Sequence, residues 1–233
     1  MDLAACRMGR VRFAKDLPAP MGGEIMRILG VLNGRDMDGD LLHAWATSAE
    51  YVVAADGAAD LLIELGVPPD MIIGDMDSMK RQSGAIEVVR DEDPSATDCD
   101  KLLRWVRQRG QHSFTLANIE GDLLDHMLAT LASCVAFRRT VRVALRRGMG
   151  WVFSGPLQIN VAPQARVSLI PLTPCSGVKL HGVQWRLDSA DLETGGQISV
   201  SNKATDGFVQ ASVSRGAAFL FAEYSREEMP FWD

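Results

Sequence analysis

Cysteines are few in this sequence, and long apolar runs are missing. The four cysteines (Cys6, Cys99, Cys134 and Cys175) lie far apart without a C-x-x-C pair, so neither a zinc site nor a disulfide framework is indicated. Scattered cysteines of this kind are typical of reduced thiols in a cytoplasmic protein. No run approaches the roughly 18 apolar residues that a membrane span needs. Residues 1–20 are basic but lack the apolar core of a signal peptide, and we expect them to form a flexible leader.

An excess of basic charge is also missing. The chain has 24 Lys and Arg against 30 Asp and Glu, a net charge of −6, which argues against nucleic acid as the main partner. Nucleotides are not excluded, because a metal ion can meet their charge locally. The sequence contains neither a Walker A loop nor a kinase glycine-rich loop, which excludes the standard nucleotide-binding motifs. Its 233 residues and ordinary composition indicate a globular protein of one or two domains.

Short apolar runs alternate with helical patterns between about residues 24 and 144. The alternation predicts strands at 25–32, 51–55, 71–73, 86–90 and 113–119, and helices at 40–48, 59–65, 97–109 and 122–138. Continuous apolar strands separated by helices are typical of a parallel sheet that is covered on both faces. We therefore expect an α/β domain with a mostly parallel, Rossmann-like sheet over residues 21–145.

The pattern changes after about residue 141, where β-rich segments follow one another without a clear helix. Strands are predicted at 167–172, 182–187, 197–200, 209–213 and 217–221, separated by Gly, Pro, Ser and Asp. Closely spaced short strands with turn residues between them are typical of an antiparallel sandwich. We expect an all-β sandwich domain over residues 150–233.

The most informative stretch is residues 74–78 (GDMDS), directly after the third apolar run. Asp75 and Asp77 place two carboxylates at the end of a buried strand. Magnesium that carries a substrate phosphate is usually bound by one or two carboxylates and several waters. An ordinary surface turn is the alternative, because Asp, Gly and Ser favour turns for local reasons.

Polar residues follow the other predicted strands of the α/β domain in the same way. Ligands of open α/β sheets bind beyond the carboxyl ends of the strands, where these residues would meet. Taken singly, each also fits a turn or a helix N-terminus. Five carboxylates at one edge would repel one another unless a cation lay among them, which favours a metal or a metal–nucleotide complex. The residues concerned are Asn33, Gly34, Asp56, Thr97, Asp98 and Asp125, together with Asp75 and Asp77.

Three residues in this part of the chain have a structural alternative of their own. Thr97 suits a helix N-cap, with Asp100 three residues later. Lys101 could reach a phosphate or pair with Asp98 on the helix surface, since the two are three residues apart. A lone histidine in a helix, such as His126, is more often structural than functional.

With these residues in view, the sequence resembles the thiamine pyrophosphokinase family. The string Pro-Asp-x-Ile-x-Gly-Asp-x-Asp-Ser is the specific part of the resemblance, and the other segments are strong as an ordered series. Together they extend over roughly residues 25–225. The matching segments are residues 55–59 (ADGAA), 69–78 (PDMIIGDMDS), 97–101 (TDCDK), 125–126 (DH) and 199–202 (SVSN).

The resemblance implies an enzyme that transfers the diphosphoryl group of ATP to the hydroxyl of thiamine and releases AMP. It implies an α/β domain that binds ATP and Mg²⁺, a β-sandwich that helps to bind thiamine, and a homodimer with sites near the subunit interface. Asp75, Asp77 and Asp98 match the metal ligands, and these three with Asp125 match the catalytic residues. The residues implied for ATP are Asn33, Gly34, Asp56, Gly57, Thr97 and Lys101, and those implied for thiamine are Asp125, His126, Trp185, Ser199 and Asn202.

The sequence departs from the family pattern at three positions, one of which is Lys203, where a glutamate is common in bacterial relatives. Ala58 stands where many relatives have a second glycine, and a methyl group there could limit close approach of the backbone to a phosphate. Leu123 stands where the family has an arginine, so a fixed cation is missing from the expected phosphate site. Two alternatives therefore stay open: a related diphosphokinase that acts on a hydroxymethylpterin, and a catalytically weakened protein that binds thiamine or a nucleotide.

Overall fold

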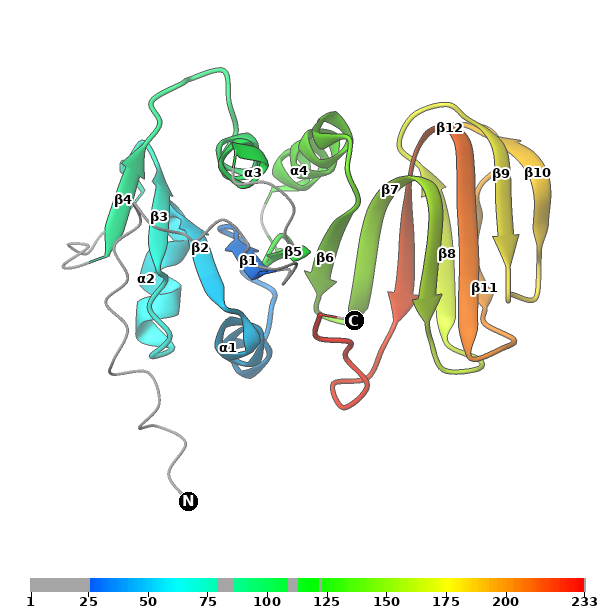
Figure 1. Ribbon diagram of the computed structural model, residues 1–233, viewed down its shortest axis with the longest axis horizontal. Coiled ribbons are helices and arrows are strands. Elements are labelled where there is room, and N and C mark those ends of the chain that lie inside the picture. Colours follow the sequence, from blue (N-terminus) through cyan, green and yellow to red (C-terminus); the bar gives the residue numbers. More distant parts are fainter. Residues whose placement is uncertain (1–25, 79–85, 109–112, 122, 233) are drawn as a thin grey trace.

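The computed structural model describes residues 26–78, 86–108, 113–121 and 123–232. The predicted leader, residues 1–20, lies outside this part of the chain. Figure 1 shows a layer of helices on each side of one half of the molecule and only strands in the other half. In these described residues, a single twelve-stranded sheet runs through both halves. None of the described helices is long and apolar enough to cross a membrane.

The first half is a parallel sheet with helices on both faces, as predicted. Its strands lie in the order β6-β5-β1-β2-β3-β4 and all pair in parallel. Apolar strands such as β2 (YVVAA) and β3 (MIIG) are buried at every residue, which requires cover on both sides. The strands are β1 (Arg27–Val31), β2 (Tyr51–Ala55), β3 (Met71–Gly74), β4 (Glu87–Arg90), β5 (Ser113–Ala117) and β6 (Val141–Leu145).

Four helices of the described part of the chain cover this sheet. Figure 1 shows α1 (Gly39–Ser48) and α2 (Asp56–Glu64) on one face, and α3 (Asp98–Gln108) and α4 (Leu124–Phe137) on the other. Helix α1 begins where Asp38 accepts hydrogen bonds from the backbone N–H groups of Asp40 and Leu41, at 3.0 and 3.3 Å. Helix α2 begins three residues before the predicted start at residue 59, which places Asp56 in its first turn.

The second half is antiparallel and has two layers that share two long strands. Strands β7 and β12 pair along their length, with a shift in register between Val213 and Ala218. The first part of β12 also pairs with β9 and the second part with β8, so the strand passes from one layer into the other. The strands are β7 (Gly148–Asn160), β8 (Arg166–Pro171), β9 (Cys175–His181), β10 (Leu187–Leu192), β11 (Ser199–Lys203) and β12 (Phe208–Glu223).

The predicted strand at 182–187 is wrong. Residues 182–186 connect β9 to β10 and contain only an isolated bridge, Val183 to Ala204. Gly182 has φ +76°, which takes the chain out of the extended conformation. The strands predicted at 209–213 and 217–221 are the two parts of β12. Strand β7 was not predicted, and its pairing with β6 continues the sheet across the expected domain boundary.

After β12 the chain returns to the α/β half and packs on α1. The indole N–H of Trp232 donates a hydrogen bond of 2.9 Å to Ser48 Oγ. The rings of Phe231 and Trp232 have centroids 4.6 and 5.4 Å from that of Trp45. From β6, the Arg142 guanidinium donates to the carbonyl oxygen of Pro230 at 2.6 Å. Residues 230–232 therefore contact α1 and β6 of the α/β half.

Candidate active site at the carboxyl edge of the parallel sheet

The order of the strands predicts where a ligand would bind. From β1 the chain builds outward through β2, β3 and β4, and then continues on the other side of β1 with β5 and β6. The strand order therefore reverses between β1 and β5. Open α/β sheets bind ligands in the crevice beyond the carboxyl ends of the strands near such a reversal. The residues that follow β1, β2, β3 and β5 are the ones to compare with the sequence prediction.

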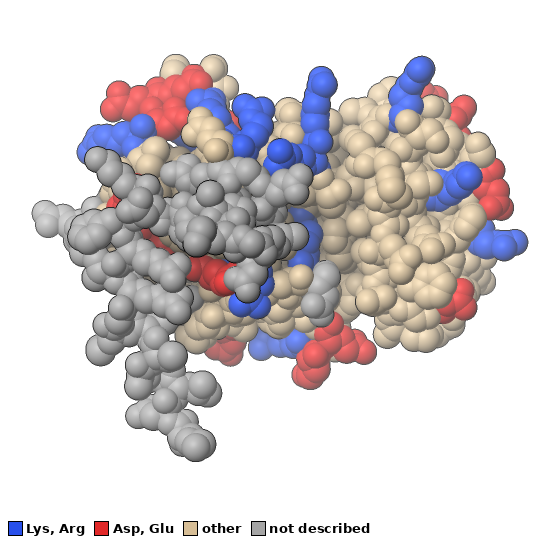
Figure 2. Space-filling model, in the orientation of Figure 1, with Lys and Arg blue, Asp and Glu red and all other residues tan. Residues whose placement is uncertain are grey.

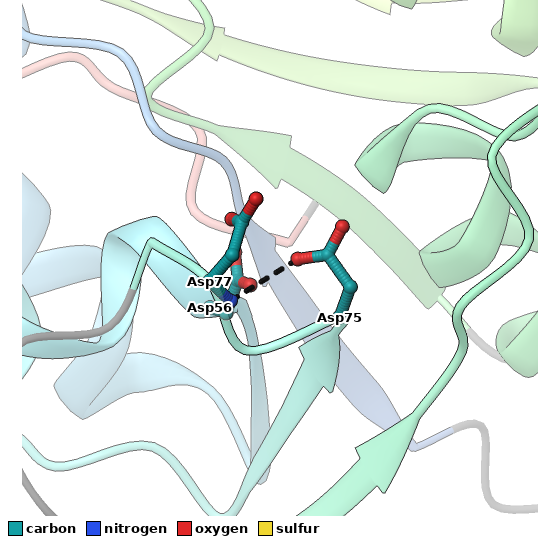
Figure 3. A group of neighbouring side chains, drawn as sticks. All are labelled: Asp56, Asp75 and Asp77. Carbon is teal, nitrogen blue, oxygen red and sulfur yellow. Dashed lines mark hydrogen bonds between the residues drawn. The ribbon is translucent and has the colours of Figure 1, made fainter.

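Three carboxylates meet beyond the ends of β2 and β3 (Figure 3). One oxygen from each of Asp56, Asp75 and Asp77 lies within 4.8 Å of the others, close enough to share one metal ion. Asp56 is buried, with 2% of its surface exposed, whereas Asp75 and Asp77 are exposed. We call these three residues the carboxylate group. Hard oxygen donors in this number are the ligands that Mg²⁺ and Ca²⁺ prefer.

Asp56 is held in place by two backbone hydrogen bonds. Its Oδ1 accepts from the N–H of Gly57 at 2.7 Å, and its Oδ2 accepts from the N–H of Met76 at 2.8 Å. A Cβ atom on Gly74 would lie 2.6 Å from Asp56 Cγ, so only glycine allows this approach. Burial, together with the charge of Asp98, raises the pKa of Asp56 above its ordinary value.

The turn after β3 orients the two exposed members of the group. Met76 has φ +71°, and the Asp77 N–H donates to Asp75 Oδ1 at 3.2 Å, which Figure 3 shows as a dashed line. This hydrogen bond lowers the pKa of Asp75 below its ordinary value. The Ser78 hydroxyl donates to Asp77 Oδ1 at 2.8 Å. The turn predicted as the alternative is therefore present, and it presents both carboxylates to solvent.

Asp98 lies beside the carboxylate group rather than in it. The Nζ atom of Lys101 is 3.5 Å from Asp98 Oδ1 and 4.0 Å from Asp75 Oδ2, so the lysine links the two. The side chain of Lys101 is only 5% exposed. Burial raises the pKa of Asp98, an effect that the neighbouring Lys101 charge partly offsets. The sequence offered two roles for Lys101, a pair with Asp98 or a contact at the site. The structure shows the pair with Asp98 and also places the ammonium group beside Asp75.

Thr97 is the N-cap of α3. Its hydroxyl accepts a hydrogen bond from the Asp100 N–H at 3.1 Å, and its own N–H donates to Asp100 Oδ2 at 2.9 Å. These reciprocal bonds form a capping box. The Thr97 hydroxyl also donates to Asp100 Oδ2 at 2.7 Å. Thr97 therefore has the helix N-cap role that the sequence offered as the alternative to a binding role.

The loops after β1 and β5 and the first turn of α2 are in close contact. The N–H of Gly34 donates to the Asn118 carbonyl at 2.7 Å, and a Cβ on Gly34 would lie 2.3 Å from that oxygen. The backbone of Gly57 approaches the side-chain amide of Asn33, since a Cβ on Gly57 would lie 2.6 Å from its Nδ2. Asn33 is exposed and Gly34 is buried. Asn33, from the loop after β1, and Gly57, from the first turn of α2, therefore lie side by side.

Asn118 is a site residue that the sequence analysis did not single out. It is buried, has φ +58°, and donates through Nδ2 to the carbonyl oxygens of Leu32 at 2.9 Å and Gly34 at 2.7 Å. It thereby ties the loop after β1 to the loop after β5. Its position directly after the apolar strand β5, as a polar residue at the carboxyl end of a parallel strand, is the signal that could have identified it.

Asp125 and His126 lie in the first turn of α4, and both are exposed. Among the described residues, Asp125 is not part of the carboxylate group. Their surroundings are apolar, because Leu123 is 62% exposed and Leu124 and Leu128 are similarly open. Leu123, at the family's arginine position, is therefore a surface residue.

The predicted thiamine residues of the second half lie together at the β9–β10 connection and β11. Trp185 is 57% exposed, whereas Asn202 is buried and hydrogen-bonded to the backbone of Trp185. Ser199 Oγ accepts a hydrogen bond of 3.2 Å from Asn202 Nδ2. The three residues that were predicted to share a thiamine site are therefore neighbours in the structure. The prediction was wrong in placing Trp185 on a strand.

Two family models match the chain and together span most of it. The model described as "Thiamin pyrophosphokinase, catalytic domain" matches residues 42–145, which include the carboxylate group. The model described as "Thiamin pyrophosphokinase, vitamin B1 binding domain" matches residues 157–217, which include Trp185. A search of curated protein sequences finds no match.

Solved structures share the fold at low sequence identity. The thiamine pyrophosphokinase of Bacillus subtilis is 19% identical with a TM-score of 0.70, over 85% of this chain and 100% of that one. The thiamin pyrophosphokinase of Geobacillus thermodenitrificans is 18% identical with a TM-score of 0.72, over 87% and 100%. The yeast thiamin pyrophosphokinase is 16% identical with a TM-score of 0.68, over 92% and 90%.

Proposed function

The chain belongs to the thiamin pyrophosphokinase family, and we propose that it transfers the diphosphoryl group of ATP to the hydroxyl of thiamine. The thiamine oxygen forms a bond to the β-phosphorus of ATP, and the bond from that phosphorus to the bridging oxygen of the α-phosphate breaks. AMP leaves with the electron pair, and the hydroxyl proton passes to a base. The products are thiamine diphosphate and AMP.

The observation that carries this proposal is the carboxylate group at the end of β2 and β3. Three aspartates within 4.8 Å fit a divalent cation, since no cation other than Lys101 pairs with them among the described residues. A bound Mg²⁺ would neutralise charge on the phosphates of ATP. Asp75 and Asp77, both exposed, are the proposed ligands from this group, and Asp98, which Lys101 links to Asp75, is the third proposed ligand. Asp56, fixed by two backbone N–H groups, supports the position of the turn after β3.

We assign the nucleotide to the sheet edge between the loop after β1 and the N-terminus of α2. Asn33 and Gly57 lie side by side there, and helix N-termini favour phosphate groups. Lys101 would add positive charge on the phosphate side. For the proton of the thiamine hydroxyl, Asp98 and Asp125 are the two candidate acceptors. The residues proposed to contact ATP are Asn33, Gly34, Asp56, Gly57, Thr97 and Lys101.

We propose that thiamine binds between two copies of the chain. Along the sheet, the path from β9 to β3 passes β12, β7, β6, β5, β1 and β2, which makes seven steps between strands. At about 4.8 Å a step, this separation is on the order of 30 Å, and Figure 1 places β9 and β3 at opposite sides of the molecule. One thiamine molecule could not contact both Trp185 and the carboxylate group of one chain. The partner subunit's Trp185 would therefore complete each site.

The surface supports this arrangement. Leu123, Leu124 and Leu128 beside Asp125, and Ile198, Val200 and Phe208 in the second half, expose apolar side chains that a partner could cover. Figure 2 shows few charged side chains over the antiparallel half on the face it presents, whereas acidic ones gather over the connection between β4 and α3. The exposed apolar side chains support the proposed homodimer with shared sites.

The domain division follows the same assignment. We propose residues 21–145 as the catalytic part and residues 150–233 as the thiamine-binding part, which contain the matched residues 42–145 and 157–217 respectively. We also propose a cytoplasmic location, because Cys99, Cys134 and Cys175 are buried free thiols.

The function is tested by incubating the purified protein with ATP, MgCl₂ and thiamine, and measuring AMP and thiamine diphosphate by chromatography. We expect the two products in equal amounts, and none with a hydroxymethylpterin as acceptor. Binding of thiamine and ATP without AMP release, by a folded protein across pH and metal conditions, would contradict the proposal.

The shared site is tested by mixing Asp75→Asn with Trp185→Ala under conditions in which subunits exchange. The assay uses a thiamine concentration so far below the raised KM of Trp185→Ala that this variant alone forms no detectable product. Mixed dimers would contain one intact site, so recovery should approach about a quarter of wild-type activity. A site within one chain predicts no recovery.

A further inference from the structure

We propose that Asn202 is a positioning residue that fixes Trp185 for thiamine and does not itself contact the substrate. This inference rests on the proposed function and changes the role that the family resemblance implied for Asn202. It starts from a contrast between two neighbours. Asn202 is 1% exposed on β11, whereas Trp185, on the connection between β9 and β10, presents more than half of its surface to solvent.

The side chain of Asn202 holds both backbone polar groups of Trp185. Its Oδ1 accepts from the Trp185 N–H at 3.1 Å, and its Nδ2 donates to the Trp185 carbonyl oxygen at 2.7 Å. These two hydrogen bonds resemble the backbone pairing of two strands, with the Asn202 side-chain amide in place of one of the backbones. The isolated bridge between Val183 and Ala204 lies just beside it.

The amide of Asn202 has no remaining capacity for a ligand. A side-chain amide offers two N–H donors and two acceptor sites on its oxygen. The second donor goes to Ser199 Oγ at 3.2 Å, and the second acceptor site takes the N–H of Lys203 at 2.9 Å. All four are therefore used within the protein. A thiamine contact would require one of these hydrogen bonds to break, at the cost of leaving a buried polar group unpaired.

The ring of Trp185 depends on this support. Among the described residues, its indole makes no stacking or cation contact and no side-chain hydrogen bond. Apart from Asn202, the connection is tied to its neighbours by backbone hydrogen bonds on either side of Val183, from Gln184 N–H to the Lys203 carbonyl at 2.8 Å and from Thr205 N–H to the Gly182 carbonyl at 2.9 Å. The orientation of the exposed ring therefore follows from the backbone that Asn202 holds.

The chemistry of thiamine explains why an ordered Trp185 ring would favour binding. The thiazolium ring of thiamine is cationic and flat, and an indole face attracts such a ring when the two are stacked. A ring that must first be ordered loses part of that attraction to conformational entropy. Asn202 removes this cost in advance, so its loss should weaken thiamine binding and leave the ATP side unchanged.

The test uses Asn202→Asp and Asn202→Ala in the full chain, with the KM of each substrate measured by AMP formation. The aspartate variant keeps the shape of the side chain but replaces the donor to the Trp185 carbonyl with an acceptor. We expect the KM for thiamine to rise about tenfold or more in both variants, the scale of a hydrogen-bonded polar group lost from a buried network, and the KM for ATP to stay within about twofold. Asn160→Asp, an exposed position at the end of β7, is the matched control and should behave like wild type.

Two comparisons separate positioning from general destabilisation. In a Trp185→Ala background, Asn202→Ala should cause no further rise in the KM for thiamine, because the ring that it positions is gone. An equal rise in that background, or equal rises for both substrates with a lowered Tm, would overturn the proposal.

A second readout does not require activity. With 5-fluorotryptophan incorporated, the ¹⁹F resonance of Trp185, assigned by its loss in Trp185→Phe, should sharpen and move toward the free amino acid in Asn202→Ala, while the other four indoles stay in place. An unchanged Trp185 resonance would overturn the positioning role. If wild-type protein forms no thiamine diphosphate, the proposed function fails, and this spectrum still decides whether Asn202 orders Trp185.

Discussion

The ammonium group of Lys101 lies 3.5 Å from Asp98 Oδ1, and only 5% of its side chain meets solvent. The same atom lies 4.0 Å from Asp75 Oδ2. The positive charge of this buried lysine offsets the repulsion between the two carboxylates and favours their ionised forms. This contact therefore sets how readily the site can take a cation as the pH falls.

Lys101→Met should shift metal binding to higher pH. Asp98 must lose its proton to bind a metal, its pKa is already raised by burial, and the Lys101 charge partly offsets that rise. Without the lysine the pKa of Asp98 rises further. As the pH falls, the variant therefore loses its affinity for the metal at a higher pH than wild type does. Calorimetric titration with MgCl₂ or MnCl₂ across pH 5–8 measures the shift. Arg104→Met, which removes a cation that pairs with Asp91 and Asp93 instead, is the control. Equal pH profiles for wild type and Lys101→Met would contradict this account.

Asp75→Asn should remove activity without unfolding the protein. The side chain is exposed and proposed to bind the metal, so we expect kcat/KM to fall by about two orders of magnitude or more. The Tm should change little, because asparagine keeps an oxygen that can accept from the Asp77 N–H and Lys101 keeps Asp98 as its partner. Asp206→Asn, in the turn between β11 and β12, is the matched control. Activity above a tenth of wild type would remove Asp75 from the proposed metal site.

Tyr224→Phe should remove a pH dependence of stability at alkaline pH. The Tyr224 hydroxyl donates to the Asn160 carbonyl oxygen, and burial raises its pKa to about 12. Between the ordinary value of 10 and about 12 the unfolded chain gives up this proton while the folded chain keeps it, so wild-type stability falls as the pH rises. Below pH 10 the phenylalanine variant should be less stable by about 1 kcal/mol, and the difference should shrink above pH 10. Urea denaturation at pH 8, 10 and 11 tests this expectation, and a constant difference would refute it.

Trp232→Ala should destabilise the α/β half. The indole packs on Trp45 and donates to Ser48, so its removal should lower the free energy of unfolding by roughly 1–3 kcal/mol, less than for a fully buried tryptophan. Trp232→Phe keeps a ring and loses the hydrogen bond, and it should fall between wild type and the alanine variant. Urea denaturation gives the order of the three, and equal stability of all three would show that this contact contributes nothing.

Much of the α/β half follows from the sequence because apolar runs and helix caps are local signals. The buried runs of β2 and β3 predicted strands, and Asp75 and Asp77 after β3 predicted a site at the sheet edge. Asn118 was missed because it looked like the last part of a strand. Its function depends on a contact with Gly34, 84 residues earlier, which no local pattern contains.

The antiparallel half was harder to predict because its strands bend. Gly155 and Gly216 have φ of +82° and +100° and lie where β7 and β12 pass between layers. In a sequence they look like the ends of strands, so β12 was divided in two and β7 was missed. The alternation around Gly182 and Trp185 predicted a strand, but the pairing there is made by the Asn202 side chain. Side-chain pairing of this kind leaves no periodic signal.

The continuous sheet across β6 and β7 has a mechanical consequence. A linker between two domains allows hinge motion, but here five consecutive residue pairs from Val141 to Leu145 fasten one half to the other. The two halves of one subunit therefore move as a rigid body. If each thiamine site lies between two subunits, its opening to admit substrate and release product must come from loop movement or from a shift of one subunit against the other.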